Sequence, residues 1–217
     1  MDHTAGAAYN WRARIGLLEP GILAENIPYE FYLVAPSGVG MVLTSLGAPP
    51  ADYTREKFEG MIANLERAVK VLITQEVDSI MQIGLPPIVQ RGWGFEDELQ
   101  AQLKGFTSVP FGTDIGSCIA GMRALGMRRV VMLSPADFHD EIQGNLTRYV
   151  GHAGIEVVAS GRVETGRPKS VMLPLAEPYR AARALYLSTP RVDGIWITGA
   201  YQPSVGMIEQ LEQDLGV

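Results

Sequence analysis

The apolar positions of the chain alternate between short uninterrupted runs and longer runs with helical spacing. The short runs predict extended segments at 15–18, 30–35, 40–45, 78–83, 109–111, 128–133, 155–159 and 193–198. The longer runs predict helices at 54–75, 95–106, 114–125, 137–153, 179–188 and 203–215. Strands that alternate with helices in this way indicate parallel βαβ units, and hence an α/β fold. In such sheets a ligand lies beyond the carboxyl ends of the strands, so the loops after strands are the ones to search for chemistry.

Two segments share one plan, in which an aspartate precedes a buried strand, a glycine and a turn. They run from Asp78 to Gly84 and from Asp193 to Gly199, and lie about half the chain apart. This loose repeat predicts two similar lobes, residues 1–111 and 112–217. Each is expected to hold a mostly parallel four-stranded sheet flanked by helices, with an active-site cleft between the lobes.

The composition of the chain argues against several classes of binding partner and site. The net charge is -6 and the sequence contains no basic run, which argues against nucleic acid and anionic membranes as partners. No apolar run reaches the roughly 18 residues of a membrane span. The single cysteine, Cys118, excludes an internal disulfide and a cysteine-based metal cluster, and it predicts a cytoplasmic protein. The three histidines are scattered along the sequence, so we expect no metal site.

Several stretches resemble a known family. They are 14–18, 117–132, 193–197 and 215–217, and the stretch SCIAGMRALGMRRVVM is the most specific of them. They are similar to the maleate isomerase and arylmalonate decarboxylase branch of the aspartate/glutamate racemase superfamily, over most of the chain from Arg14 onward. The resemblance implies two facing lobes, no cofactor, and a small carboxylic acid held by backbone amides and hydroxyls. It also implies a homodimer or a higher homo-oligomer, and we place a subunit contact near 93–95.

The sequence departs from this family at the decisive positions. Members of the family use one or two cysteines that flank the substrate, but the matching positions here are Gly84 and Gly199. Leu85 and Pro86 replace a Thr-Ser pair that helps to bind a carboxylate, and proline has no backbone N–H to offer. Phe138 stands near the place of a tyrosine. Cys118 lies inside a predicted helix, where we expect a buried structural thiol.

Without a thiol, the candidates for proton transfer are Glu19, His139 and Tyr201. Glu19 ends the first strand, where a partly buried carboxylate is suited to act as a general base; the alternatives are an exposed turn residue or an ion pair between lobes. Histidine side chains are suited to proton transfer near neutral pH, but for His139 we favour a solvent-facing helix start capped by Asp137. Tyr201 offers a phenol, or simply an aromatic ring that closes the cleft.

The candidates for substrate binding lie in the same loops. They are Gly84, Leu85, Thr113, Asp114, Phe138, Gly199 and Ala200. Asp114 is predicted to be an N-cap carboxylate, and a catalytic role for it requires a raised pKa. Thr113 could bind a carboxylate together with the amino end of the same helix.

These observations lead to one main hypothesis and two alternatives. The main hypothesis is a cofactor-free enzyme that decarboxylates or isomerises a small carboxylic acid through a carbanion or enediolate, without a thiol. The first alternative is a carboxylate-binding protein that has lost catalysis on this scaffold. The second is a hydratase or hydrolase in which a carboxylate activates water.

Overall fold

A computed structural model describes residues 9–21, 25–47, 55–163, 173–200 and 202–217. The chain divides into two compact units, Met1–Gly116 and Ser117–Val217. The division lies within helix α5 (Asp114–Ala124), slightly beyond the boundary predicted after residue 111. No helix among the residues described is long and apolar enough to cross a membrane.

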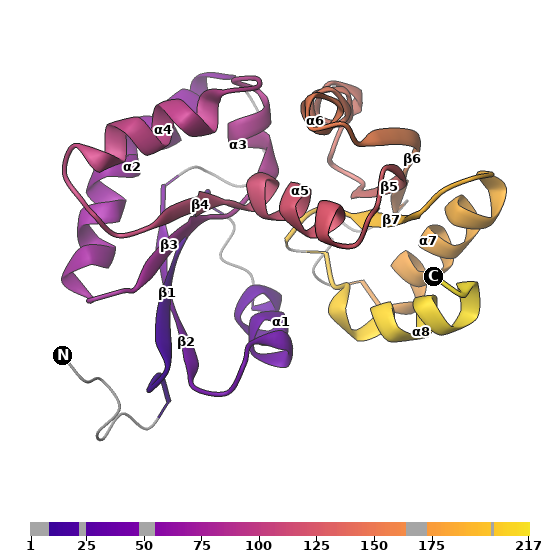
Figure 1. Ribbon diagram of the computed structural model, residues 1–217, viewed down its shortest axis with the longest axis horizontal. Coiled ribbons are helices and arrows are strands. Elements are labelled where there is room, and N and C mark those ends of the chain that lie inside the picture. Colours follow the sequence, from indigo (N-terminus) through magenta and orange to yellow (C-terminus); the bar gives the residue numbers. More distant parts are fainter. Residues whose placement is uncertain (1–8, 22–24, 48–54, 164–172, 201) are drawn as a thin grey trace. The chain divides into compact units, whose positions relative to one another are not determined.

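The first unit is built on a four-stranded parallel sheet. Its strands are β1 (Ala13–Glu19), β2 (Val39–Ser45), β3 (Ser79–Gln82) and β4 (Phe111–Thr113), in the order β2-β1-β3-β4. Its helices are α1 (Asn26–Val34), α2 (Arg55–Thr74), α3 (Leu85–Val89) and α4 (Phe95–Lys104). The apolar stripe of α2 includes Leu65, Val69 and Leu72, all fully buried. Figure 1 shows β4 running directly into α5, so the carboxyl end of this strand is also the start of a helix.

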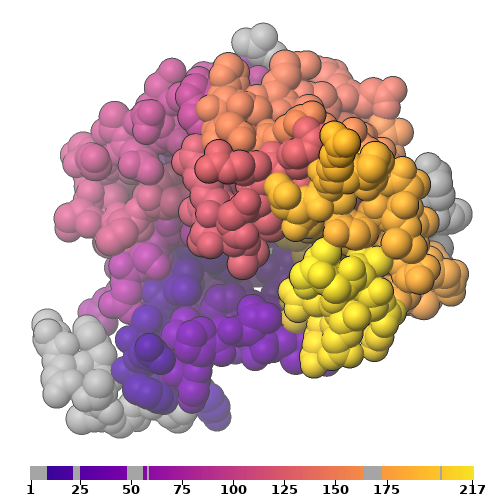
Figure 2. Space-filling model, turned by 45° about the vertical axis from the view of Figure 1, so that its right-hand side comes forward, coloured from indigo at the N-terminus to yellow at the C-terminus, as the bar shows by residue number. Residues whose placement is uncertain are grey.

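The second unit contains a parallel sheet with three strands among the residues described. They are β5 (Arg129–Pro135), β6 (Glu156–Val163) and β7 (Gly194–Ile197), in the order β6-β5-β7, whereas the sequence predicts four strands. Its helices are α6 (Asp140–His152), α7 (Ala176–Ser188) and α8 (Val205–Leu215). Leu133, Ala182 and Met207 belong to one buried cluster that joins the sheet to α7 and α8. Figure 2 shows α8, in yellow, as a ridge on the surface with α7 beside it.

The predicted α/β architecture is confirmed, but one predicted strand is wrong. Residues 30–35 are rich in aromatic and β-branched side chains, yet they lie in or next to helix α1. The reason is topological: β1 and β2 pair in parallel, and a parallel pair requires a crossover connection, which α1 provides. The Tyr32 hydroxyl accepts a hydrogen bond from the backbone N–H of Met41 in β2, at 3.2 Å.

The two halves of the sequence repeat have the same backbone frame. At the start of β3, the Asp78 carboxylate accepts a hydrogen bond from the N–H of Arg14, at 2.7 Å. At the start of β7, the Asp193 carboxylate accepts hydrogen bonds from the N–H groups of Arg128 and Arg129, both at 2.8 Å. In both copies, therefore, an aspartate ties the start of one strand to the start of its neighbour.

The carboxyl ends of the repeated strands are also alike. After β3, the N–H of Ile83 donates to the carbonyl of Leu18, at 2.9 Å. After β7, the N–H of Thr198 donates to the carbonyl of Leu133, also at 2.9 Å. Each strand therefore continues its pairing for one residue and then turns at the glycine that follows.

Candidate active site

Gly84 marks the end of the β3 repeat in the first unit, and both of its peptide groups are hydrogen bonded to side chains. Its N–H donates to Oδ2 of Asp114 at 2.7 Å, and its carbonyl accepts a hydrogen bond from Nε2 of Gln82 at 3.0 Å. The amide predicted to meet a substrate is thus bonded to a carboxylate of the protein. Leu85, the next residue, begins α3 and is 4% exposed.

The backbone at Gly84 does not accommodate a side chain. Its φ is +95°, a region that L residues rarely adopt, and an added Cβ would lie 2.4 Å from Cγ of Pro20. A thiol at this position would therefore require both a different backbone conformation and a shift of the proline ring.

Thr113, rather than Asp114, caps helix α5. The Thr113 hydroxyl accepts a hydrogen bond from the N–H of Gly116 at 3.1 Å, three residues on, which is the N-cap geometry. The predicted N-cap role of Asp114 is therefore wrong, because Asp114 is the first residue of the helix itself. Thr113 is 2% exposed, and its hydroxyl also donates to the Glu96 carboxylate.

The Asp114 carboxyl has the raised pKa that a catalytic role requires. Burial of the carboxyl raises its pKa from 3.8 to about 7, opposed by hydrogen bonds from the N–H groups of Gly84 and Ile115 and assisted by the negative charge of Glu96. The residue as a whole is only partly buried, but its Oδ1 is inaccessible and has no hydrogen-bond partner among the residues described. One oxygen of Asp114 is thus anchored by the Gly84 N–H, and the burial of the carboxyl favours its protonated form.

Glu96 belongs to this cluster, although its position in the sequence does not single it out. It lies in the first turn of α4, in an acidic run that is typical of a solvated helix start. Its carboxylate nevertheless reaches the Thr113 hydroxyl, from a residue 17 positions away. No local signal predicts this contact, because it depends on how α4 packs against the end of β4.

Glu19 lies on the same carboxyl edge of the sheet. It is the last residue of β1 and is 3% exposed, which rules out the exposed-turn alternative. Its carbonyl accepts a hydrogen bond from the N–H of Leu46 at 2.7 Å. Pro20, which follows it, is the residue that packs on Gly84. Its role as a general base stays a prediction.

Gly199 turns the chain after β7 in the second unit with the same geometry. Its φ is +91°, and an added Cβ would lie 2.4 Å from Cγ of Pro135. Here the adjacent polar groups are hydroxyls: Thr198 donates to Ser134 at 3.0 Å, and both residues are buried. Ala200 is exposed.

Phe138 and His139, two further candidates of the second unit, lie after β5. Phe138 is 2% exposed, and its carbonyl accepts a hydrogen bond from Nε of Arg162 at 2.7 Å. His139 is exposed at the N-cap position of α6, and its side chain makes no capping hydrogen bond. Because the helix begins at Asp140, the predicted cap role of Asp137 is wrong. Tyr201 lies outside the described residues.

A sequence comparison gives the family. The sequence model of the arylmalonate decarboxylase family matches residues 15–217. The chain belongs to the arylmalonate decarboxylase family. Among curated relatives, the maleate isomerase of Geobacillus stearothermophilus is 23% identical over 171 residues, which are 76% of this chain and 66% of that protein. The chain thus spans just under two thirds of the length of that relative.

Solved structures of related proteins confirm the fold class. A cysteine variant of the Nocardia farcinica maleate cis-trans isomerase, with a covalently bound succinylcysteine intermediate, has a TM-score of 0.80 at 21% identity. A liganded arylmalonate decarboxylase with two substitutions has a TM-score of 0.81 at 18% identity. In each comparison the match covers 94% of this chain and 85% of the other. The maleate isomerase of Pseudomonas putida S16 with maleate scores 0.73 at 24% identity, covering 93% and 84%.

The one cysteine of the sequence lies apart from both repeated strands. Cys118 lies in α5 and is partly exposed, not buried as predicted. It follows neither β3 nor β7, the strands that end at Gly84 and Gly199. That these two glycines occupy the positions of the family's cysteines stays a prediction. Among the described residues, no group of three or more His, Cys, Asp or Glu side chains is placed to hold a metal ion.

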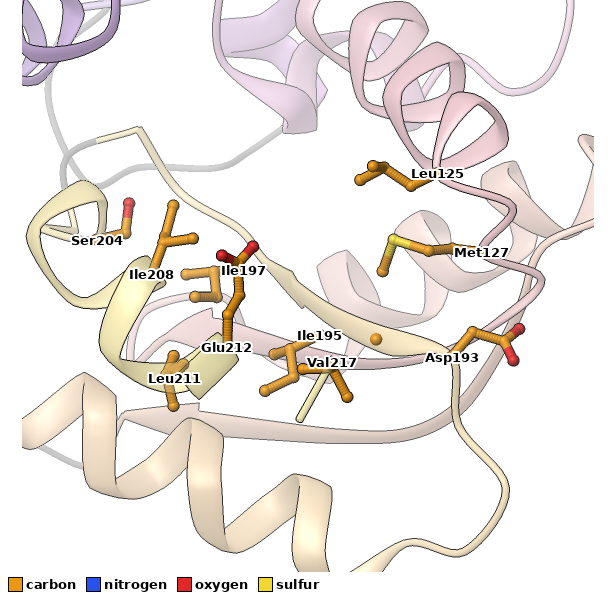
Figure 3. A pocket seen from close by; sticks show the side chains of 11 residues that line it. Leu125, Met127, Asp193, Ile195, Ile197, Ser204, Ile208, Leu211, Glu212 and Val217 are labelled. Atoms are coloured by element: carbon orange, nitrogen blue, oxygen red, sulfur yellow. The ribbon is translucent and has the colours of Figure 1, made fainter. Parts of the chain in front are cut away.

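The second unit also contains an apolar pocket of about 410 Å³. Its wall includes Met127, Ile195, Ile208 and Leu211, and Figure 3 shows Ser204 and Asp193 toward opposite ends. None of the predicted site residues lines this pocket, and it offers few polar groups. The titratable cluster at the strand ends of the first unit is therefore the candidate active site.

Proposed function

We propose that the chain is a cofactor-independent enzyme that decarboxylates or isomerises a small carboxylic acid through a carbanion or enediolate. A carboxyl group, not a thiol, carries the proton. The observation that supports this most directly is Asp114, whose pKa of about 7 suits proton transfer near neutral pH. The family supports the substrate class, because its members include maleate isomerases and arylmalonate decarboxylases.

The proposed decarboxylation step balances without a cofactor. The bond between the reacting carbon and one carboxylate breaks, CO₂ leaves, and the electron pair stays on the carbon as an enediolate with the remaining acid group. A proton then moves from the Asp114 carboxyl to that carbon, and the carboxyl recovers a proton from water. Oδ2 keeps the carboxyl in place through the Gly84 N–H. In an isomerisation, Glu19 removes a proton from the carbon beside a carboxylate to give the same kind of enediolate, and Asp114 returns a proton to a carbon of that intermediate.

The amino end of α5 favours the anionic intermediate. Asp114 is the first residue of this 11-residue helix, so the partial positive charge of the helix end lies at the carboxyl edge of the sheet. Glu19, at the end of β1, is the proposed base where the reaction removes a proton. His139 and Tyr201 remain alternative proton donors. Gly199, Ala200 and Phe138 remain proposed contacts of the substrate, and a cytoplasmic homo-oligomer remains the expected state.

A second candidate function is ligand binding without turnover. Two observations favour it: the sequence has no cysteine after either repeated strand, and the Gly84 amide is already bonded to a carboxylate. In that case the candidate site of the first unit would hold a carboxylic acid and perform no chemistry.

The test is proton NMR of the protein in D₂O with malonates, maleate and 2-hydroxy acids. We expect loss of a carboxyl group, a change in double-bond geometry or entry of deuterium for at least one acid. Asp114→Asn should reduce that rate by about 100-fold or more, because it removes the acid, while Asp97→Asn on the exposed face of α4 should leave it unchanged.

The outcomes separate the two functions. Turnover that Asp114→Asn does not slow would move the proton-transfer role to His139, Tyr201 or Glu19. No turnover on any acid, together with a rise in melting temperature on addition of some of them, would instead identify a binding protein.

A further inference from the structure

Glu96 differs from the other acidic residues at the start of α4. Glu96, Asp97 and Glu98 all occupy the first turn, where negative charge is favourable for a helix. Asp97 and Glu98 are exposed, as a solvated helix start requires. Glu96 is half-buried, and its carboxylate accepts a hydrogen bond from the Thr113 hydroxyl. Stabilisation of the helix start does not explain that contact.

The Thr113 hydroxyl has a fixed orientation. A hydroxyl has a single proton, and here the proton points to the Glu96 carboxylate while a lone pair accepts the N–H of Gly116 at 3.1 Å. Because Thr113 is 2% exposed, water does not readily replace either partner. The hydroxyl therefore joins the negative charge of Glu96 to the first turn of α5, the turn that begins with Asp114.

Gly116 leaves the space that this contact needs. An added Cβ would lie 2.7 Å from Oε1 of Glu96 and 3.2 Å from Oγ1 of Thr113. Glycine within a helix costs about 1 kcal/mol relative to alanine. Gly116 is therefore unfavourable for the stability of the helix, but a methyl group in its place would displace the Glu96 carboxylate.

We propose that Glu96 is a positioning residue for the Asp114 carboxyl: through Thr113 it fixes the first turn of α5, and its negative charge helps Asp114 to hold a proton. The consequence for catalysis rests on the proposed function. Glu96 is the charged residue from another element that raises the pKa of Asp114, after the larger effect of burial.

The other elements around Asp114 contribute little charge. The end of β3 contributes Gln82, the turn after it contributes Gly84, and the start of α3 contributes Leu85, all of them uncharged. Asp114 is the only acidic residue in the first turn of α5. The end of β1 places Glu19 on the same edge of the sheet. Glu19→Gln is therefore the variant that separates a general effect of nearby charge from the effect of Glu96.

The test is a carbon-13 NMR titration of the Asp114 carboxyl in the full-length protein, assigned by its loss in Asp114→Asn. Glu96→Gln keeps the shape of the side chain and an oxygen that accepts from Thr113, but removes the charge. We expect the Asp114 titration midpoint to fall by about half a unit to one unit, since a like charge raises the pKa of a carboxyl. Asp97→Asn and Glu19→Gln should move it less.

Gly116→Ala tests position as distinct from charge. It keeps the Glu96 side chain but displaces its carboxylate, so the Asp114 midpoint should fall in the same direction even though alanine favours the helix. Unchanged midpoints in both Glu96→Gln and Gly116→Ala would overturn the proposal. So would an equal fall in Asp97→Asn.

The pH dependence of turnover separates this inference from the proposed function. If Asp114 donates the proton, activity is lost as the pH rises through its pKa, and Glu96→Gln should move that loss to lower pH by the same amount as the NMR midpoint. A midpoint that moves while the activity profile does not would contradict the role of Asp114 but leave the role of Glu96 intact. The opposite outcome is an activity profile that follows the Asp114 midpoint while Glu96→Gln changes neither of them. That outcome would support the role of Asp114 and contradict the role of Glu96.

Discussion

The turns at Gly84 and Gly199 have one backbone design and two different chemical settings. In both, a glycine with positive φ follows a strand and packs against a proline ring at the end of the neighbouring strand. Around Gly84 the polar neighbours are the Gln82 amide and the Asp114 carboxylate, whereas beside Gly199 they are the Thr198 and Ser134 hydroxyls. The repeat therefore supplies a scaffold, and among the residues that the structure describes the buried carboxyl with a raised pKa lies at the first copy.

The largest expected effect tests whether the two turns really share a design. Gly84→Ala and Gly199→Ala should each lower the free energy of unfolding by about 2–4 kcal/mol, because each adds a strained φ and a methyl group against a proline. Urea unfolding measures both. Gly60→Ala in α2 is the control, since nothing lies within 4 Å of its added Cβ, and it should stabilise by about 0.5–1 kcal/mol. A tolerated alanine at either turn would break the comparison.

The next effect concerns the Asp114 carboxyl beside the first copy. Because the folded pKa of Asp114 is raised from 3.8 to about 7, its contribution to stability is complete below pH 4 and is lost as the pH rises to 7. Asparagine does not ionise, so Asp114→Asn should raise the free energy of unfolding by about 1–3 kcal/mol at pH 8 and change it little at pH 4. Urea unfolding at several pH values measures this. A gain that does not depend on pH would contradict the raised pKa.

The third effect concerns the hydroxyl pair of the second copy. Thr198→Val should lower the free energy of unfolding by about 1–2 kcal/mol, because the buried Ser134 hydroxyl then loses its partner. The double variant with Ser134→Ala should cost less than the sum of the two single changes, since it leaves no unpaired hydroxyl. Additive costs in a double-mutant cycle would show that the pair does not interact.

The smallest effect compares the aspartates that begin the two repeats. Hydrogen bonds from the N–H groups of Arg128 and Arg129 hold the pKa of Asp193 below its usual 3.8. Its contribution to stability is present above that value and is lost as the pH falls through the lowered pKa. Asp193→Asn should therefore flatten the acid limb of stability below pH 4. For the comparison of the two aspartates, Asp78→Ala removes the acceptor of one N–H and Asp193→Ala the acceptor of two, so Asp78→Ala should lower the free energy of unfolding by less.

The sequence predicts the scaffold well because the scaffold depends on local patterns. The strands that end before Gly84 and Gly199 are short buried runs followed by glycine, and the structure confirms them. The strand predicted at 30–35 was wrong because parallel pairing of β1 and β2 demands a crossover, a requirement that local β propensity does not contain.

The candidate site is less predictable, because its properties come from packing. The position of Asp114 after a strand singles it out, but its pKa depends on burial and on the Gly84 N–H, which lies 30 residues away in the sequence. Glu96 and Gln82 were not predicted at all. The first belongs to an ordinary acidic helix start, and the second is a single polar residue in a buried strand.

A carboxyl that titrates at about pH 7 also makes binding at this site a matter of proton linkage. An anion that binds beside Asp114 favours its protonated form, so at neutral pH the protein takes up part of a proton with each ligand. The enthalpy of binding would then vary with the ionisation enthalpy of the buffer, and apparent affinity for a dicarboxylate would weaken as the pH rises above 7. Such a site would therefore distinguish ligands by their negative charge and by the number of protons taken up on binding, as well as by their shape.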